Sequence, residues 1–251
     1  MGEKIATRNA YGQALAELAN QHPEVVCFDA DLAGATMSKF FLEAHPDRFF
    51  DMGIAESNMQ GVAAGMAACG YKPFTNTFAM FAAGRSWEQI RNSICYPGLN
   101  VKVVGSHGGI SVGEDGATHQ CIEDFAIMRV IPGMTVLCPC DANEMRQAVA
   151  ALIDYDGPAY MRLGRLAVET VTDAIPGYKF ELGKGIQLRE GKDVTVILNF
   201  TPVAHVDHNI NVPLPGKYRE IFNSDDPKYG GSGILNTGIM EAFPVTGNFL
   251  H

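Results

Sequence analysis

The sequence has 251 residues, of which 47% are hydrophobic and 19% charged, the composition of a globular protein with one large or two modest cores. Its formal net charge of −9 argues against a nucleic-acid-binding protein. No apolar run reaches the roughly 20 residues that a membrane-spanning helix needs, and the N-terminal residues lack the apolar core of a signal peptide. We therefore expect a cytoplasmic protein that contacts neither nucleic acid nor membrane.

Residues 1 to about 165 alternate between helical and strand-like patterns. Thr7 is placed to cap a first helix, whose apolar residues recur at helical spacing. The predicted strands span about 25–28, 49–52, 73–77, 101–104, 135–137 and 159–162, and the later helices about 55–69, 80–95, 120–129 and 142–153. Repeated strand–helix–strand units predict an α/β fold, a parallel sheet with helices on both faces.

The composition changes beyond about residue 190. From Asn199 onward the chain is rich in Asn, Pro, Gly and Asp and has no helical period. Short β-like pieces occur at 194–200, 211–212 and 218–222. We therefore expect a boundary between about 165 and 195, followed by a short β-rich tail.

The six cysteines point to reduced, buried thiols rather than to a metal or redox site. Five of them fall in apolar stretches of a chain without an export signal. Cys138 and Cys140 are separated by a single proline, which does not match the common two-residue spacing of metal-binding or redox cysteine pairs. The prediction is that the chain holds no metal of its own.

Glu56 is the first candidate functional residue, because it stands where a predicted strand leads into an apolar helix. In parallel sheets, ligands bind beyond the carboxyl ends of the strands. A glutamate in a first helical turn is also favoured by the helix dipole alone. The functional alternative is a partly buried carboxyl group suited to proton transfer.

Phe78 and Phe81 lie three residues apart at the next strand-to-helix junction, where they could pack in the core or stack on a flat heterocycle. The loop 106–120 is rich in glycine and contains two histidines and two carboxylates, which is typical of a functional loop rather than a connector. Arg8, Arg162 and Arg165 lie near the ends of predicted elements. If they converge with His107 they form a phosphate-binding cluster; otherwise they are solvated.

Several long segments in this order resemble the pyrimidine-binding domain of transketolases, and more closely the C-terminal subunit of transketolases that are encoded as two chains. The resemblance runs from about Lys4 to Arg165. Its strongest pieces are ATRNA, DADLAGAT, FFDMGIAESNM, FTNTFAMFAAGR, WEQIRNSICYP, VGSHGGISVGEDGATHQ and GPAYMRLGR.

The resemblance assigns the cofactor site of thiamine diphosphate to four residues. It implies that Glu56 hydrogen-bonds the pyrimidine ring nitrogen, that Phe78 and Phe81 are aromatic walls around this ring, and that Asp31 lies close to the cofactor. A tyrosine found in the same wall of many single-chain transketolases is Gly84 here.

The resemblance also implies a sugar site. His107, Asp115 and His119 match residues that contact the sugar, with Asp115 reading a hydroxyl and His119 near the reacting end. Arg8, His107 and Arg165 match the cluster that holds the sugar phosphate. The serine expected in that cluster is Ala35 here, with Thr36 beside it. Glu56, His107 and His119 are thus the predicted catalytic residues.

The implied activity is transfer of a two-carbon ketol unit between phosphorylated sugars, as in the pentose phosphate reactions of carbohydrate metabolism. Nothing in the chain resembles the diphosphate-binding domain that supplies the Mg²⁺ ligands. An N-terminal, diphosphate-binding partner subunit is therefore expected, in a heterotetramer. The alternatives are a role like deoxyxylulose-phosphate synthase or a 2-oxo-acid dehydrogenase β-subunit, or a truncated, catalytically dead subunit.

The tail departs from the transketolase pattern. Residues 1–170 are the expected pyrimidine-binding domain, 171–195 a linker and the start of a truncated C-terminal domain, and 196–251 a separate tail. The segments ILNFTPV and VPLPGKYREIFNSDDPKYGGSG resemble part of the C-terminal β-domain of glycogen branching enzymes. A carbohydrate-binding tail is a further alternative. The branching enzyme's catalytic barrel is missing, so no glucan chemistry is implied.

Overall fold

The computed structural model describes residues 3–185, 216–219, 227–229 and 238–242. Its contacts divide the chain into two units, Met1–Leu188 and Arg189–His251. No helix in the described ranges is both long enough and apolar enough to cross a membrane.

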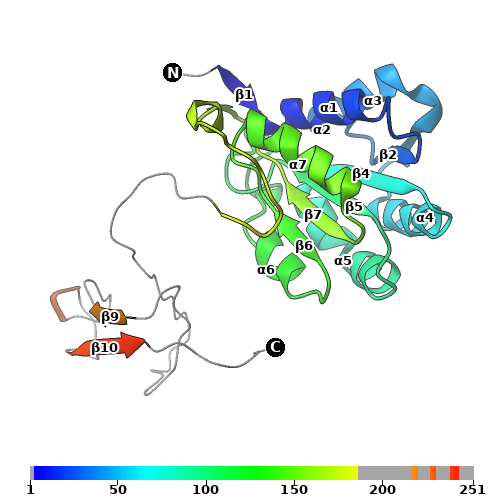
Figure 1. The fold of residues 1–251 in the computed structure, drawn as a ribbon. Coiled ribbons are helices and arrows are strands. Elements are labelled where there is room, and N and C mark those ends of the chain that lie inside the picture. Colours follow the sequence, from blue (N-terminus) through cyan, green and yellow to red (C-terminus); the bar gives the residue numbers. More distant parts are fainter. Residues whose placement is uncertain (1–2, 186–215, 220–226, 230–237, 243–251) are drawn as a thin grey trace. The chain divides into compact units, whose positions relative to one another are not determined.

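A six-stranded parallel sheet forms the centre of the first unit, in the order β3-β2-β4-β5-β7-β6 (Figure 1). Its strands are β2 (Val25–Asp29), β3 (Phe49–Asp51), β4 (Lys72–Phe78), β5 (Lys102–Ser106), β6 (Thr135–Leu137) and β7 (Ala159–Arg162). Every neighbouring pair is parallel. The predicted parallel α/β sheet is therefore confirmed.

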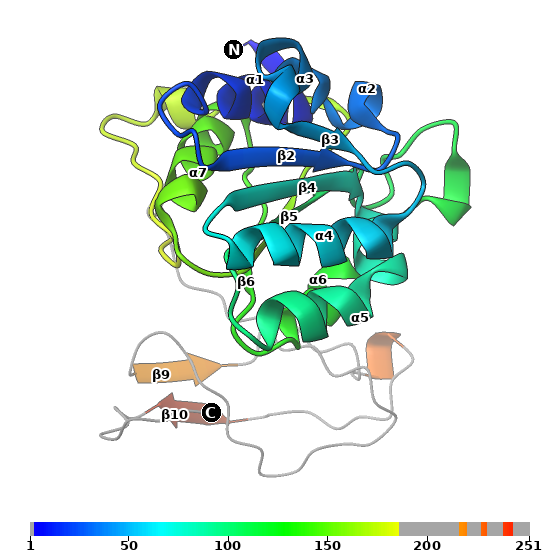
Figure 2. The ribbon, with the colours of Figure 1, turned by 90° about the vertical axis from the view of Figure 1, so that its right-hand side faces the viewer.

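Helices cover both faces of this sheet, as the two core clusters and Figure 2 show. The helices α1 (Thr7–Leu18) and α7 (Ala142–Asp154) pack on one face, and α4 (Glu56–Ala68), α5 (Trp87–Gln89) and α6 (Asp124–Arg129) on the other. Strand β2 shows why: Val25 and Cys27 belong to the first cluster, Val26 to the second. Alternate side chains of a strand face opposite sides, so burial on both faces explains the apolar run at the start of β2.

Several predicted elements differ in detail. The region predicted as one helix over 80–95 consists of two π-helical segments, Phe81–Arg85 and Ile90–Cys95, on either side of α5. Thr7 is not a cap: it is the first residue of α1, and its hydroxyl accepts a hydrogen bond from Gly164 N at 2.9 Å. The remaining short helical pieces are α2 (Ala33–Thr36), α3 (Lys39–Ala44), Pro46–Arg48, Gly116–Thr118 and Thr172–Ala174.

A small antiparallel ladder joins β1 (Lys4–Ala6) to β8 (Ala167–Glu169). Each strand has only three residues, so neither has a periodic signal in the sequence. The prediction of buried cysteines holds for Cys27, Cys95 and Cys121, but Cys69 and the Cys138/Cys140 pair are exposed. Exposure of that pair follows from its position just after β6, at the edge of the sheet.

The second unit contains a described antiparallel pair, β9 (Gly216–Arg219) with β10 (Ile239–Ala242), and a single 3₁₀ turn at Pro227–Tyr229. Lys217 and Glu241 face each other across the pair at 3.8 Å. The predicted β-like piece at 218–222 overlaps β9, whereas the pieces predicted at 194–200 and 211–212 lie outside the described residues. The described part of the tail thus contains the expected β-structure.

Candidate functional site

The predicted site residues come from segments that meet at the carboxyl edge of the sheet. Asp31 follows β2, Glu56 opens α4 after β3, Phe78 ends β4, His107 follows β5 and Arg165 follows β7. Arg8 belongs to the first turn of α1. A parallel sheet brings all its strand ends to one edge, which explains how residues spread over 157 positions form one site.

Glu56 is almost completely buried, with only 4% of its surface exposed. One of its carboxylate oxygens, Oε1, accepts a hydrogen bond from Arg85 Nη1 at 2.9 Å. The backbone of Arg85 is tied to the same helix end, because Ser57 Oγ donates to the Arg85 carbonyl oxygen at 2.9 Å. A buried carboxylate needs such partners, since an unpaired charge away from water is unfavourable.

Phe78 and Phe81 form a stacked pair with ring centroids 5.7 Å apart and planes inclined by 19°. The His119 ring stands edge-on to both, at 5.2 Å from Phe81 and 6.1 Å from Phe78. The centroid of the His107 ring lies 4.1 Å from that of Phe78, and the Nε2 atom of this ring faces Arg8. The two phenylalanines are therefore not simple core residues: they connect the Glu56 region, through Arg85 over Phe81, to both histidines.

A chain of hydrogen bonds fixes the orientation of the buried His107 ring. Ser106 Oγ donates to the Thr77 carbonyl oxygen at 3.3 Å, which leaves it to accept from His107 Nδ1–H at 3.0 Å. His107 Nε2 then accepts from Arg8 Nη1 at 3.4 Å. These bonds assign a neutral ring with its proton on Nδ1. Burial, with the positive charges of Arg8 and Arg165, lowers the pKa of His107 to about 4.

Arg8 and Arg165 place two positive charges beside this neutral histidine. Arg8 Nη1 donates to the Ala35 carbonyl oxygen at 2.6 Å, and burial together with the Arg165 charge lowers the pKa of Arg8. The Arg165 guanidinium lies against the glycine-rich loop, since a Cβ at Gly113 would come within 2.7 Å of its Nη1. Within residues 3–185 neither arginine forms an ion pair with a carboxylate. Two close guanidiniums that form no ion pair with a carboxylate favour a bound oxyanion.

Arg162 does not belong to this cluster, so only two of the three arginines considered in the sequence converge with His107. Its Nε lies 3.3 Å from Asp124 Oδ2, and its Nη2 donates to the Cys121 carbonyl oxygen at 2.8 Å. The buried Tyr160 hydroxyl donates to the same Asp124 oxygen at 2.7 Å. Arg162 is thus held by a buried carboxylate and is not available to bind substrate.

Arg162 instead holds together the two ends of the glycine-rich loop 106–120. Gly109 N donates to Cys121 O at 2.7 Å, the same carbonyl that Arg162 binds, so residues 109 and 121 are held together. Asp115 and His119 lie on the segment between them. Asp115 is exposed and lies close enough for its negative charge to offset part of the lowering of the His107 pKa. This closure explains how a glycine-rich segment can present its side chains in a defined place.

Replacing Gly108 with alanine should disturb this closure. An added Cβ would lie 2.0 Å from Arg162 Nε, so the guanidinium must leave Asp124 and Cys121. We expect the free energy of unfolding to fall by about 1–3 kcal/mol, the usual cost of overpacking, with faster amide exchange over 110–120. Gly34→Ala is the control, because its Cβ meets no atom within 4 Å. Equal denaturation midpoints and exchange rates in the two variants would contradict the closure.

The low pKa of His107 predicts a loss of stability in acid. Unfolded chains take up a proton at this residue near pH 6.5, whereas the folded chain does so only near pH 4. Folding is therefore disfavoured progressively as the pH falls from 6.5 to 4, by about 3 kcal/mol in total. The free energy of unfolding, measured with urea across this range, should fall with decreasing pH in the wild type relative to that in His107→Asn. If the free energy of unfolding depended on pH equally in the two proteins, His107 would not be shielded from protonation.

Asp31 lies at the same edge but outside the connected cluster. Its backbone has a positive φ of 61°, and its amide donates to Asp51 Oδ1 at 3.2 Å. Its own exposed carboxylate has no hydrogen bond or ion pair within residues 3–185. The segment that carries it is held by Asp29, whose buried carboxylate accepts from Leu32 N, Thr36 Oγ1 and Ser38 Oγ at 2.5, 2.7 and 2.8 Å.

Sequence reasoning missed Arg85, Ser106 and Asp29, all of which hold or contact predicted site residues. Only Arg85 had a local signal, since it follows Phe81 by four residues, a spacing that places two helical side chains on one face. No cluster of three metal-binding side chains occurs in the described part of the chain. The site does suit a flat heterocycle: it offers aromatic ring faces and a buried carboxylate that can bind a ring nitrogen.

Comparison with known families and proteins agrees with this geometry. The family model described as "Transketolase, pyrimidine binding domain" matches residues 3–170, and that of "Alpha amylase, C-terminal all-beta domain" matches residues 179–250. The second match supports the glucan-enzyme likeness of the tail, from an earlier residue than the predicted 196 and without naming a branching enzyme.

Relatives and solved structures of the transketolase type match the first part of the chain. A protein of Methanocaldococcus jannaschii described as the C-terminal section of a transketolase is 46% identical over 76% of this chain and 60% of its own length. A subunit of the 6-deoxy-6-sulfo-D-fructose transketolase of a Clostridium species is 44% identical over 78% and 61%.

Among solved structures, "Split gene transketolase, inactive beta4 tetramer" matches with a TM-score of 0.67 and 51% identity over 76% of this chain and 61% of that one. The chain thus spans about three fifths of the relatives it matches. Because the family model covers residues 3–170, more than half of the sequence, the chain belongs to the transketolase pyrimidine-binding-domain family.

Proposed function

We propose that this chain is the pyrimidine-binding subunit of a two-chain, thiamine-diphosphate-dependent transketolase that transfers a two-carbon ketol unit between phosphorylated sugars. The observation that carries the proposal is one continuous set of contacts from the Glu56 carboxylate, through Arg85 and the Phe78–Phe81 stack, to His107 and the Arg8–Arg165 pair. The carboxylate at one end of this aromatic wall suits a cofactor ring, and the cationic cluster at the other end suits an anionic sugar.

Glu56, Phe78, Phe81 and Asp31 are the residues of this chain that would hold the cofactor. Thiamine diphosphate would supply a thiazolium carbon as the nucleophile for the ketose carbonyl, and its cationic ring would act as the electron sink when the carbon–carbon bond breaks. Glu56 would hydrogen-bond the pyrimidine nitrogen with a carboxyl group shielded from water. Phe78 and Phe81 would limit the tilt of the ring, since aromatic faces prefer offset stacking.

The histidines and arginines would act on the sugar. Arg8 and Arg165 would bind its phosphate, with His107 Nε2 between them as a neutral partner whose protonation the anion would favour. His119, edge-on to both phenylalanines, would hold a proton near the reacting end of the sugar. Asp115 would accept a hydrogen bond from a sugar hydroxyl. One relative is named for a substrate, 6-deoxy-6-sulfo-D-fructose, that carries a sulfonate. Substrates that differ only in their terminal anion, phosphate or sulfonate, therefore test which anion the site prefers.

A partner subunit and Mg²⁺ complete the proposal. The relatives include a transketolase C-terminal section, and one similar solved structure is an inactive β4 tetramer of a split-gene transketolase. We propose that an N-terminal, diphosphate-binding subunit brings the Mg²⁺ ligands and forms a heterotetramer with this chain. Residues 1–170 would provide the shared site, 171–195 a linker, and 196–251 a tail outside the reaction. The alternative is a catalytically dead subunit that still binds its partner.

Calorimetric titration of thiamine diphosphate with Mg²⁺ tests the shared site. Binding should require this chain and the diphosphate-binding subunit together and should weaken when Phe81→Ala removes one aromatic face. Stacking of this kind contributes about 0.5–1.5 kcal/mol beyond area, so the dissociation constant should rise by roughly 3–10-fold. Failure of the mixture to bind the cofactor, despite a stable complex by sedimentation, would contradict the proposal.

A further inference from the structure

Arg85 contacts both groups that would receive the cofactor's pyrimidine. Its Nη1 donates to Glu56 Oε1 at 2.9 Å, and its Cζ lies 4.0 Å from the centroid of the Phe81 ring. The guanidinium therefore occupies the carboxylate and one aromatic face at once. None of the family-based assignments above gives this residue a role.

The chemistry of a guanidinium makes this double contact significant. It is planar, it stacks on aromatic faces, and its N–H groups bind carboxylates in a fixed geometry. A pyrimidine held by the same carboxylate and ring face must use the same partners. Arg85 and the cofactor ring therefore cannot both make these contacts to Oε1 and to this face of Phe81.

The structure also allows Arg85 to leave without unfolding the site. Its side chain is 51% exposed, whereas that of Glu56 is 5% exposed. Its carbonyl oxygen is anchored by Ser57 Oγ, so the backbone can stay in place while the side chain turns into solvent. The π-helical turn Phe81–Arg85 that carries it also carries Phe81, so the two side chains move on a common support.

We propose that Arg85 is a stand-in for the pyrimidine: it pairs with Glu56 and covers Phe81 in the unassembled chain, and cofactor binding displaces it. This inference rests on the proposed thiamine-diphosphate site and adds a residue that sets cofactor affinity. The ion pair keeps the buried carboxylate satisfied while the site is incomplete. It also opposes cofactor binding, because displacement must break it first.

The first arm of the test measures the ion pair in the full chain alone, without cofactor. Arg85→Met and Glu56→Gln, singly and together, are compared by urea denaturation. In the wild-type background, Arg85→Met should lower the folding equilibrium constant about threefold more than it does in the Glu56→Gln background, as for a half-exposed ion pair. Additive effects would show that the two side chains do not interact, which overturns the proposal.

The second arm measures the calorimetric dissociation constant of thiamine diphosphate with Mg²⁺ for the complex with the diphosphate-binding subunit. Arg85→Met should tighten binding by roughly 3–10-fold, since the competing contact of about 1 kcal/mol is gone. Arg85→Lys should stay near wild type, and the exposed Arg91→Met serves as the matched control. Unchanged or weaker binding in Arg85→Met overturns the stand-in role. A wild-type complex that binds no cofactor contradicts the proposed function itself, a result distinct from either.

Discussion

Glu56→Gln is expected to lower the ketol-transfer rate of the assembled enzyme by about 10²–10⁴-fold, the range for loss of a general acid–base group. Glutamine keeps the size of the side chain and an oxygen that can accept from Arg85 Nη1, but it cannot exchange a proton with a ring nitrogen. The fold should therefore persist, with a change in the free energy of unfolding of about 1 kcal/mol.

Steady-state kinetics and denaturation of the same preparation check this prediction. Glu43→Gln is the matched control, because Glu43 is an exposed glutamate at the end of α3, away from the strand ends that form the site. A rate within a few fold of wild type in Glu56→Gln would remove Glu56 from proton transfer. A large loss of stability would instead show that the buried carboxylate is mainly structural.

Arg165→Ala should raise the Michaelis constant for a phosphorylated ketose by roughly 10–100-fold, with little change in kcat. Hydrogen bonds to a charged group contribute about 1.5–3 kcal/mol, and a phosphate far from the reacting carbon is bound equally in the ground and transition states. The Arg8 guanidinium and the neutral His107 would still contact the phosphate, so part of the binding free energy would be kept.

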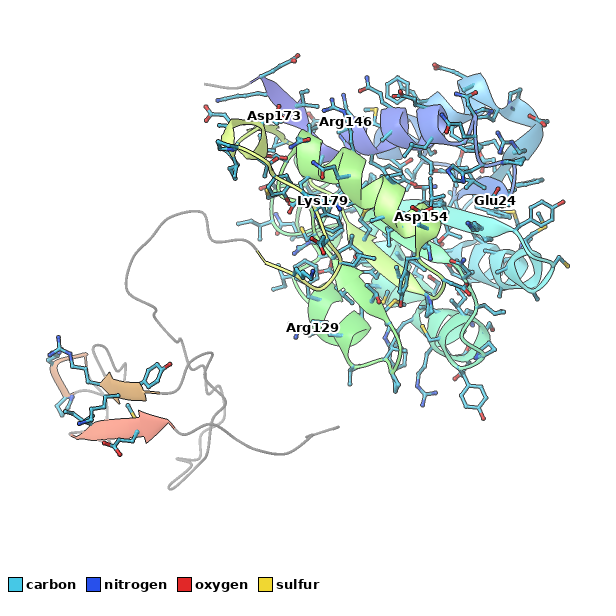
Figure 3. All side chains as sticks on the ribbon, in the orientation of Figure 1. Glu24, Arg129, Arg146, Asp154, Asp173 and Lys179 are labelled. Atoms are coloured by element: carbon cyan, nitrogen blue, oxygen red, sulfur yellow. The ribbon has the colours of Figure 1, made fainter. Side chains whose placement is uncertain are left out.

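The same variant must be compared on an unphosphorylated ketose and on a sugar sulfonate. Arg146→Ala is the control for surface charge, since Arg146 is exposed on α7 (Figure 3). An equal loss on the unphosphorylated sugar would contradict the anion-binding role. A larger loss on the sulfonate than on the phosphate would identify the terminal anion as sulfonate.

The sheet could be predicted from the sequence because strands such as the one over Val25–Asp29 contain apolar runs and alternate with segments of helical period. The strand ends then placed Glu56, Phe78 and His107 at one edge. The helical character of 80–95 was predicted, but its π-helical turns were not, because such turns keep apolar residues at nearly helical spacing. Burial of Cys138 and Cys140 was also wrong, since an apolar sequence neighbourhood does not reveal that a strand lies at the edge.

The polar network around the site could not be predicted, because its partners are far apart in the chain. Asp124 and Arg162 are 38 positions apart, and Glu56 and Arg85 are 29 apart. An isolated arginine gives no local sign of which carboxylate it will face. Arg162 therefore looked equivalent to Arg165 in the sequence, and only the structure shows that it closes the loop while Arg165 lies against Gly113.

The most direct test of the central claim is ketol transfer from a ketose phosphate to an aldose phosphate, in the presence of thiamine diphosphate and Mg²⁺. The chain is assayed alone, with a diphosphate-binding transketolase subunit, and as Glu56→Gln in the same mixture. Activity only in the wild-type mixture is the predicted result. No activity in any mixture, despite a stable complex that binds the cofactor, would contradict a catalytic role and identify the chain as a dead half-enzyme.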